Sequence, residues 1–158
     1  VVYFVRHGES EYNAKKLIGG DSHLTPTGLE FARKLQHWVK ENIPDAEEEL
    51  SVWSSTMQRA IETSSDIPCH QYVRWKALEE IDAGICDAMT YEQIEETHPE
   101  EFEARKKDKL RYRYPRGESY EDVIRRVEPV LIELEQKKTP VMVISHQAVL
   151  RCLYGYFS

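Results

Sequence analysis

The sequence predicts an α/β fold with a mostly parallel central sheet flanked by helices on both faces. Two apolar runs with the composition of buried strands, 1–5 and 141–145, lie near opposite ends of the chain. Segments with helical periodicity alternate with strand-like segments, most clearly at 26–39 and 119–134. Such alternation is typical of parallel sheets, because each crossover helix packs back onto the sheet. We expect one domain over residues 1–158.

Composition excludes several classes of protein. The chain carries a formal net charge of −7, with 41% hydrophobic and 31% charged residues. This charge argues against a general nucleic-acid binder. The sequence contains no apolar run of about 18 residues, so it predicts no membrane-spanning helix. Cys69, Cys86 and Cys152 lack metal-type spacing and cannot all pair within one chain. We therefore expect buried free thiols in a cytoplasmic protein.

A long helix is predicted after residue 25. Thr25 is a typical helix cap, and Pro26 occupies the first helical position, where its missing N–H costs nothing. Five residues are spaced for one apolar face: Leu29, Ala32, Leu35, Trp38 and Val39.

The middle of the chain is less regular. We expect a loop at 43–49, strands at 50–54 and within 68–73, a helix at 56–64, irregular structure at 75–90, and helices at 91–98 and 100–109.

The last long helix begins with a capping box. Ser119 and Asp122 have the spacing of that motif. Pro129 lies inside the helix and should kink it. The residues expected on its apolar face are Val123, Val127, Val130, Leu131 and Leu134.

Two predicted strands end at a polar pair that contains histidine. Strand 1–5 is followed by Arg6-His7, then by Gly8, which we expect to allow a sharp turn. Strand 141–145 is followed by His146-Gln147. If the two strands are neighbours in a parallel sheet, both pairs lie at its carboxyl edge, where α/β proteins bind ligands.

These residue types suit phosphoryl transfer. His7 can attack phosphorus if its ring is neutral and its N–H is held by an acceptor, for which we expect a backbone carbonyl. Arg6, Arg59 and His146 can bind the three phosphoryl oxygens. Because no carboxylates have metal-ligand spacing, we expect these cations in the place of a metal ion, and no cofactor.

A basic stretch follows an acidic one. Residues 92–103 contain six glutamates, and residues 105–116 contain seven lysines and arginines against Asp108 alone. By itself this pattern is typical of a solvated, salt-bridged surface. Arg105 and Lys109 are four apart, which predicts that they share one side of a helix, and Gln147 and Arg151 have the same spacing.

Four motifs together resemble those of the histidine phosphatase superfamily, which includes the phosphoglycerate mutases. They cover nearly the whole chain in the family's order: Arg6-His7-Gly8-Glu9-Ser10, Leu24-Thr25-x-x-Gly28, Ser55-Thr56-Met57-Gln58-Arg59-Ala60 and Ser145-His146-Gln147. Within the superfamily, segments 75–84, 89–92, 111–122 and 145–152 are most similar to the bisphosphatase domains of the 6-phosphofructo-2-kinase/fructose-2,6-bisphosphatase family.

The resemblance implies a phosphoglycerate mutase-like fold and hydrolysis of the 2-phosphate of fructose-2,6-bisphosphate. His7 would become a phosphohistidine, and Glu80 would protonate the leaving oxygen and then activate water. Arg6, Asn13, Arg59 and His146 would surround the phosphoryl group. The implied contacts to the sugar and its 6-phosphate are Gly19, Tyr91, Arg105, Lys109, Tyr120, Gln147 and Arg151. Glu79, beside Glu80, is expected on the surface, although two adjacent carboxylates could raise one pKa.

Alternatives remain at this point. A mutase or a broader sugar phosphatase would share the reaction chemistry, and a non-catalytic phosphate-binding regulatory domain would share only the binding groups. The family also implies an N-terminal kinase domain, whose nucleotide-binding loop motif is missing from this sequence. We therefore expect a fragment that lacks its C-terminal end and any kinase domain. We expect a small sugar bisphosphate as substrate, no nucleic-acid or membrane partner, and a homodimer.

Overall fold

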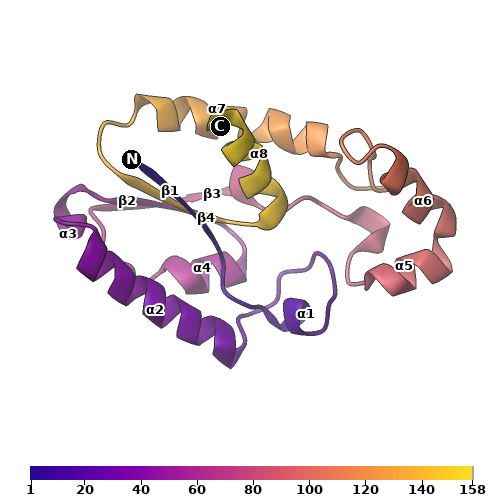
Figure 1. Cartoon of the computed structure of the whole chain (residues 1–158), viewed down its shortest axis with the longest axis horizontal. Coiled ribbons are helices and arrows are strands. Elements are labelled where there is room, and N and C mark those ends of the chain that lie inside the picture. Colours follow the sequence, from indigo (N-terminus) through magenta and orange to yellow (C-terminus); the bar gives the residue numbers. More distant parts are fainter. Residues whose placement is uncertain (158) are drawn as a thin grey trace.

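The computed structural model describes residues 1–157 as a parallel sheet between two helical layers (Figure 1). The four strands of these residues pair in the order β1-β4-β2-β3, and every pairing is parallel. Their bounds are β1 Val2–Arg6, β2 Ser51–Ser55, β3 Gln71–Trp75 and β4 Val141–Ser145. The predicted fold class is confirmed, and the two strands that end in histidine pairs are neighbours.

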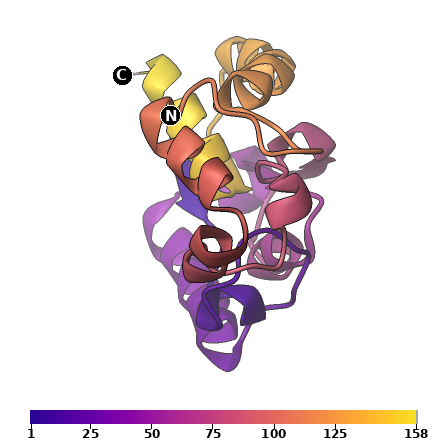
Figure 2. The same cartoon turned by 90° about the vertical axis from the view of Figure 1, so that its right-hand side faces the viewer.

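Helices cover both faces of the sheet. In Figure 1, α7 and α8 lie on one side of the sheet and α2 and α4 on the other, while α5 and α6 stand beyond the carboxyl ends of the strands. Figure 2 shows α5 and α6 in front when the molecule is viewed from that end. The helices are α1 Glu11–Ala14, α2 Pro26–Asn42, α3 Ala46–Glu49, α4 Gln58–Ser64, α5 Tyr91–Thr97, α6 Pro99–Lys107, α7 Tyr120–Gln136 and α8 Gln147–Phe157, with 3₁₀ turns η1 Lys76–Leu78 and η2 Gly84–Cys86.

The central strand β4 is buried on both faces. Val141 and Val143 pack into the cluster formed with α7 and α8, while Met142 and Ile144 pack into the cluster formed with α2 and α4. Successive side chains of a strand point to opposite faces, so an uninterrupted apolar run is required where both faces are covered. This explains why β4 was recognisable from sequence.

The expected apolar face of α2 is narrower than its spacing suggests. Leu35 and Val39 are buried, but Leu29 and Trp38 each remain 42% exposed. Trp38 contacts the ring of Tyr3 edge-on at 5.8 Å between centroids. Tyr3 belongs to β1, which is an edge strand of the sheet. No further strand lies beyond β1 to cover Trp38, so this side chain stays partly exposed.

The predicted helix starts are confirmed. The Thr25 hydroxyl accepts a hydrogen bond from the Gly28 N–H, and Ser119 and Asp122 form a reciprocal capping box. All five residues of the expected α7 face are buried, and α7 continues through Pro129 as one element.

Several local predictions need correction. The loop expected at 43–49 contains the short helix α3, and Asp45 before it adopts a left-handed conformation with φ of 54°. The third strand begins and ends later than expected, at Gln71–Trp75. The helix expected at 100–109 ends at Lys107, because Asp108 leaves helical geometry.

The three cysteines are free, as predicted, but only Cys86 is buried, whereas Cys69 and Cys152 are half-buried. Among residues 1–157, no helix combines the length and apolar character that crossing a bilayer requires.

Candidate phosphate-binding active site

A cavity of about 810 Å³ opens at the carboxyl edge of the sheet. It is bounded by the end of β1, by the first turns of α8, by the loop after α1, and by α5 and α6. Of the thirteen residues expected in the site, only His146 does not line this cavity. The twelve that do are Arg6, His7, Asn13, Gly19, Arg59, Glu80, Tyr91, Arg105, Lys109, Tyr120, Gln147 and Arg151. Tertiary structure therefore gathers residues from almost the whole chain into one site.

Strand pairing places the two histidines together. Arg6 of β1 is in register with Ser145 of β4, and the His7 N–H donates to the Ser145 carbonyl at 3.2 Å. The rings of His7 and His146 consequently lie 5.0 Å apart between centroids. This confirms the expectation that both polar pairs share one edge of the sheet.

The His7 imidazole is neutral and held in one orientation. Its Nδ1 lies 2.6 Å from the Gly8 carbonyl oxygen, and Arg59 Nε donates to its Nε2 at 3.3 Å. Burial, with smaller effects from nearby Arg59 and Arg6, lowers the pKa of His7 from 6.5 to about 4, against the opposing effect of the Gly8 hydrogen bond. The proton therefore resides on Nδ1 and the lone pair on Nε2. The expected backbone acceptor is confirmed.

Gly8 is required by a close approach of two backbone segments. A Cβ at Gly8 would lie 2.7 Å from the Gly28 carbonyl oxygen, and one at Gly28 would lie 2.1 Å from the Glu9 carbonyl oxygen. Gly8 is absent from the residues with positive φ, so the expected special turn is not the reason for this glycine. The Gly8 N–H also donates to Thr63 Oγ1, which anchors the loop to α4.

Two further groups present donors at the His7 end of the cavity. Arg59, in the first turn of α4, is 4% exposed and donates through Nη1 to the Gly20 carbonyl at 2.8 Å. Asn13 uses Oδ1 to accept the Ser10 N–H, which leaves its amide N–H₂ group for other partners. Together with Arg6, these groups can bind the oxygens of an anion next to His7.

Glu80 has the properties of a general acid. Burial raises the pKa of its carboxyl, against the opposing effects of two backbone hydrogen bonds and of Arg59 and Arg6. Those hydrogen bonds come from the N–H groups of Ile81, at 2.9 Å, and Ala148, at 3.3 Å. A buried carboxyl that holds its proton to higher pH can deliver it to a leaving oxygen.

Glu79 is turned away from this site. Its carboxylate accepts a hydrogen bond from the Thr56 hydroxyl, and it is half-buried rather than on the open surface. Glu79 does not contribute to the raised pKa of Glu80, so the suggestion that the adjacent pair produces this shift is wrong.

His146 packs against the ring of His7 and is not among the residues that line the cavity. It is fully buried, and burial is the main cause of a pKa well below the usual value. Its Nε2 lies 2.8 Å from Ser55 Oγ, whereas its Nδ1 has no hydrogen-bond partner within residues 1–157.

The cavity also holds a basic cluster. Arg105, Lys109 and Arg151 all line it, and the repulsion of Arg105 is the first cause of a lowered pKa of Lys109. The helical argument for Arg105 and Lys109 is wrong, because α6 ends before Lys109 and the following turn carries that lysine into the cavity. Gln147 and Arg151 do share α8, as predicted.

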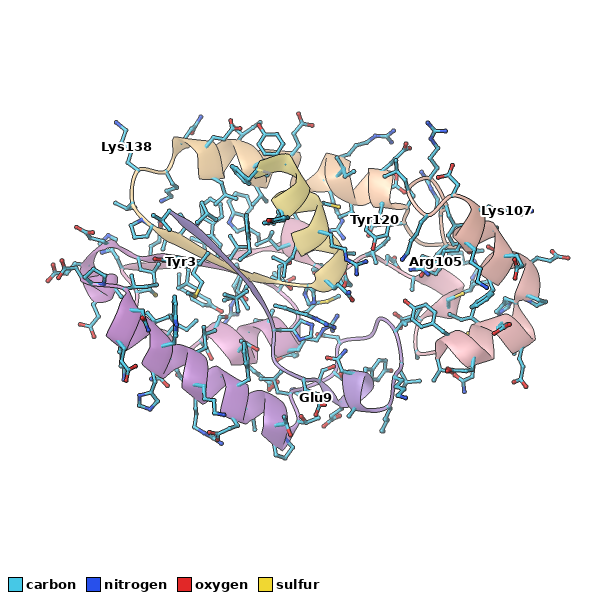
Figure 3. The ribbon with its side chains drawn as sticks, viewed as in Figure 1. Tyr3, Glu9, Arg105, Lys107, Tyr120 and Lys138 are labelled. Atoms are coloured by element: carbon cyan, nitrogen blue, oxygen red, sulfur yellow. The ribbon has the colours of Figure 1, made fainter. Side chains whose placement is uncertain are left out.

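Sequence reasoning missed an aromatic clamp around Arg105. Its guanidinium lies 5.4 Å from the ring centroid of Tyr91 and 6.0 Å from that of Tyr114. Tyr114 is 6% exposed and lines the cavity. The tyrosines interleaved with arginines at 111–114 were the available indication. Figure 3 shows Arg105 between α6 and α8, whereas Lys107 lies on the outer side of α6.

Lys16 was also missed. It lines the cavity from the loop after α1, with φ of 60°. Nothing in its local sequence indicated this position. Across residues 1–157, no group of three or more histidines, cysteines or acidic residues is arranged to hold a metal ion.

The chain is similar in sequence to several curated proteins. A 6-phosphofructo-2-kinase/fructose-2,6-bisphosphatase of Arabidopsis thaliana is 55% identical over 157 residues, which are 99% of this chain and 21% of that protein. A fructose-2,6-bisphosphatase of Saccharomyces cerevisiae is 52% identical over 156 residues, 99% of this chain and 34% of that protein. The chain thus spans about a fifth to a third of the length of these curated relatives.

Solved structures share the fold. YhfR of Bacillus stearothermophilus superimposes with a TM-score of 0.85 at 25% identity, covering 99% of this chain and 78% of that one. The alpha-ribazole phosphatase of Shigella flexneri gives 0.83 at 23% identity, covering 98% and 78%. The sequence profile of the histidine phosphatase superfamily (branch 1) matches residues 2–158. The chain belongs to this superfamily.

Proposed function

We propose that this domain hydrolyses the 2-phosphate of fructose-2,6-bisphosphate, giving fructose 6-phosphate and phosphate. The observation that carries the proposal is the cavity itself, which contains a neutral, oriented imidazole and also a basic cluster of Arg105, Lys109 and Arg151. A substrate with two phosphates at a fixed separation matches this arrangement. The names of the relatives from Arabidopsis thaliana and Saccharomyces cerevisiae support the choice of substrate.

In the first step, His7 Nε2 attacks the phosphorus of the 2-phosphate. A P–N bond forms and the bond from phosphorus to O2 of the sugar breaks. Protonated Glu80 gives its proton to O2, and fructose 6-phosphate leaves. Arg6, Arg59, Asn13 and His146 stabilise the charge on the three phosphoryl oxygens.

In the second step, the carboxylate of Glu80 accepts a proton from water, and the water oxygen attacks phosphorus. The P–N bond breaks and its electron pair returns to Nε2 of His7. Phosphate leaves, and Glu80 is again protonated for the next cycle. All the charge stabilisation in this scheme comes from side chains, so we expect activity to survive chelation by EDTA.

The basic cluster of the cavity supplies specificity. Arg105, Lys109 and Arg151 bind the 6-phosphate in this proposal. The sugar is held by Gly19, Tyr91, Tyr120 and Gln147. A phosphatase for small or varied monoesters has no use for a second cationic pocket, which favours a bisphosphate substrate over a phosphoglycerate or a general sugar phosphate.

We also propose a cytoplasmic setting and a linked kinase domain in the parent protein. The three free cysteines support the first, and the names and greater lengths of the curated relatives support the second. A homodimer stays a prediction.

A phosphate-release assay tests the proposal. Fructose-2,6-bisphosphate should be hydrolysed far faster than phosphoglycerates or simple sugar phosphates. Substrate labelled in its 2-phosphate should transfer label to the protein in an acid-labile, base-stable linkage, and His7→Ala should abolish that labelling. Equal rates on all substrates would contradict the specificity, and undiminished labelling of the variant would remove His7 as nucleophile.

A further inference from the structure

Ser55 and His146 form a buried contact beside His7. Ser55 ends β2 and His146 follows β4, and both residues are fully buried. Ser55 Oγ lies 2.8 Å from His146 Nε2 and also accepts the Met57 backbone N–H at 3.0 Å. A serine hydroxyl has one proton to donate, so its partners can be counted.

Two proton arrangements are possible at this contact. If Ser55 O–H donates to Nε2, the neutral ring carries its proton on Nδ1, and one buried donor, Nδ1–H, lacks a partner. If Nε2–H donates to Ser55, both the serine proton and the Nδ1 lone pair lack partners among the described residues. The first arrangement leaves fewer buried polar groups unpaired and is therefore favoured.

The unpaired Nδ1–H has a natural partner in the proposed reaction. The His146 ring is 5.0 Å from the His7 ring between centroids, so it adjoins the place where a phosphoryl group on His7 would sit. Phosphoryl oxygens accept hydrogen bonds from such donors. With burial holding His146 neutral, the ring can donate to phosphate through one nitrogen only, and its tautomer decides which one.

We propose that Ser55 is a positioning residue that holds His146 as its Nδ1–H tautomer and thereby keeps a hydrogen-bond donor directed at the phosphoryl group on His7. The inference rests on the proposed function for the identity of the phosphoryl donor. The proposal gives a role to Ser55, the first residue of the Ser55–Arg59 motif. In that motif only Arg59 is expected to contact the phosphate.

The tautomer is measured directly by long-range ¹H–¹⁵N correlation NMR of the ¹⁵N-histidine-labelled protein, with the His146 signals assigned from the spectrum of His146→Gln. We expect protonated Nδ1 and unprotonated Nε2, and a shift of the Nδ1 signal on addition of inorganic phosphate. A ring protonated on Nε2 in the unsubstituted protein would overturn the proposal, as would Nδ1 signals that phosphate leaves unmoved.

Kinetics supply a second arm with a matched control. Ser54 is the preceding residue of β2, equally buried, and its hydroxyl donates to the Ser55 carbonyl rather than to His146. Ser55→Ala should lower kcat about tenfold with KM unchanged, less than the loss from deleting an oxyanion donor outright. Ser54→Ala should keep kcat, and Ser55→Thr, which retains the hydroxyl, should restore most of it.

Equal kcat values for Ser55→Ala and Ser54→Ala would overturn the proposal. If Ser55→Ala does not fold, the NMR arm on the unsubstituted protein and on Ser55→Thr still gives a decision. If the unsubstituted protein releases no phosphate from fructose-2,6-bisphosphate, the proposed function fails, whereas the tautomer and its response to inorganic phosphate still test the role of Ser55.

Discussion

Arg59 Nε donates a hydrogen bond to Nε2 of His7 at 3.3 Å. Because an N–H group points at this nitrogen, Nε2 must carry a lone pair, and the Gly8 carbonyl at 2.6 Å accounts for the proton on Nδ1. The proposed nucleophile and a proposed phosphate-binding cation are thus in direct contact. When substrate binds, its phosphate oxygens would accept the hydrogen bond of Arg59 in place of His7 Nε2. This frees the lone pair of Nε2 for attack.

The acid limb of phosphoenzyme formation should lie unusually low. The nucleophilic form of His7 is the neutral ring, and its pKa is lowered to about 4. The single-turnover rate of label transfer from fructose-2,6-bisphosphate should therefore be retained as pH falls through 6 and should halve near pH 4. A limb near 6.5, the ordinary value for histidine, would contradict the assigned burial of this ring.

Stability should fall over the same range of pH. The unfolded chain protonates His7 near pH 6.5, but the folded chain does so only near 4, so acid favours the unfolded state between these values. The full difference corresponds to about 3 kcal/mol in the free energy of unfolding. Urea titrations from pH 7 to 4 should show a smaller decline for His7→Gln than for the unsubstituted protein. Substitution of the exposed His37 by Gln serves as the control and should leave the decline unchanged.

Glu80→Gln should slow turnover by about 10²- to 10⁴-fold, because the amide cannot deliver a proton to the leaving oxygen. KM should change little, since the carboxyl already pairs with backbone N–H groups of Ile81 and Ala148 and not with a cation at contact distance. Steady-state assays at neutral pH measure this. Glu79→Gln is the control, because Glu79 pairs with Thr56 away from His7, and it should retain near-normal kcat. If the two variants are equally active, another residue is the acid.

Lys109→Ala should raise KM for the bisphosphate far more than KM for a substrate without the 6-phosphate. Lys109 lines the cavity together with Arg105 and Arg151. Lys107→Ala removes an equal charge from the outer side of α6 and should change neither value (Figure 3). Equal effects of Lys109→Ala on the two substrates would exclude a separate pocket for the second phosphate.

Two glycines should respond in opposite directions to alanine. A Cβ at Gly28 would lie 2.1 Å from a backbone oxygen, so Gly28→Ala should destabilise the protein by about 1–3 kcal/mol or more. A Cβ at Gly155 in α8 would meet nothing within 4 Å, so Gly155→Ala should stabilise it by about 0.5–1 kcal/mol. Thermal unfolding measures both. A neutral Gly28→Ala would show that the His7 loop can move away from α2.

Sequence reasoning succeeded where one local rule decides the outcome. The run at 141–145 could only be a strand buried on both faces, and Thr25-Pro26 could only begin a helix. It failed where a side chain's surroundings come from distant segments. Lys109 lies in the cavity because the chain turns after α6. Helical spacing correctly predicted that Lys109 lies near Arg105, but the two residues do not share a helix.

The same distinction runs through the site. The residue types of the chain determine that phosphate chemistry is possible: Arg6 and His7 at the end of a strand, Arg59 at the start of a helix, and the carboxylic acid Glu80. Only the tertiary structure decided that Glu80 lines the cavity with a raised pKa whereas Glu79 pairs with Thr56, that Gly8 serves a close approach to Gly28, and that Ser55 meets His146. Protonation and hydrogen-bond pairing depend on burial and on contacts across the sheet, and these arise only when strands far apart in the sequence lie side by side.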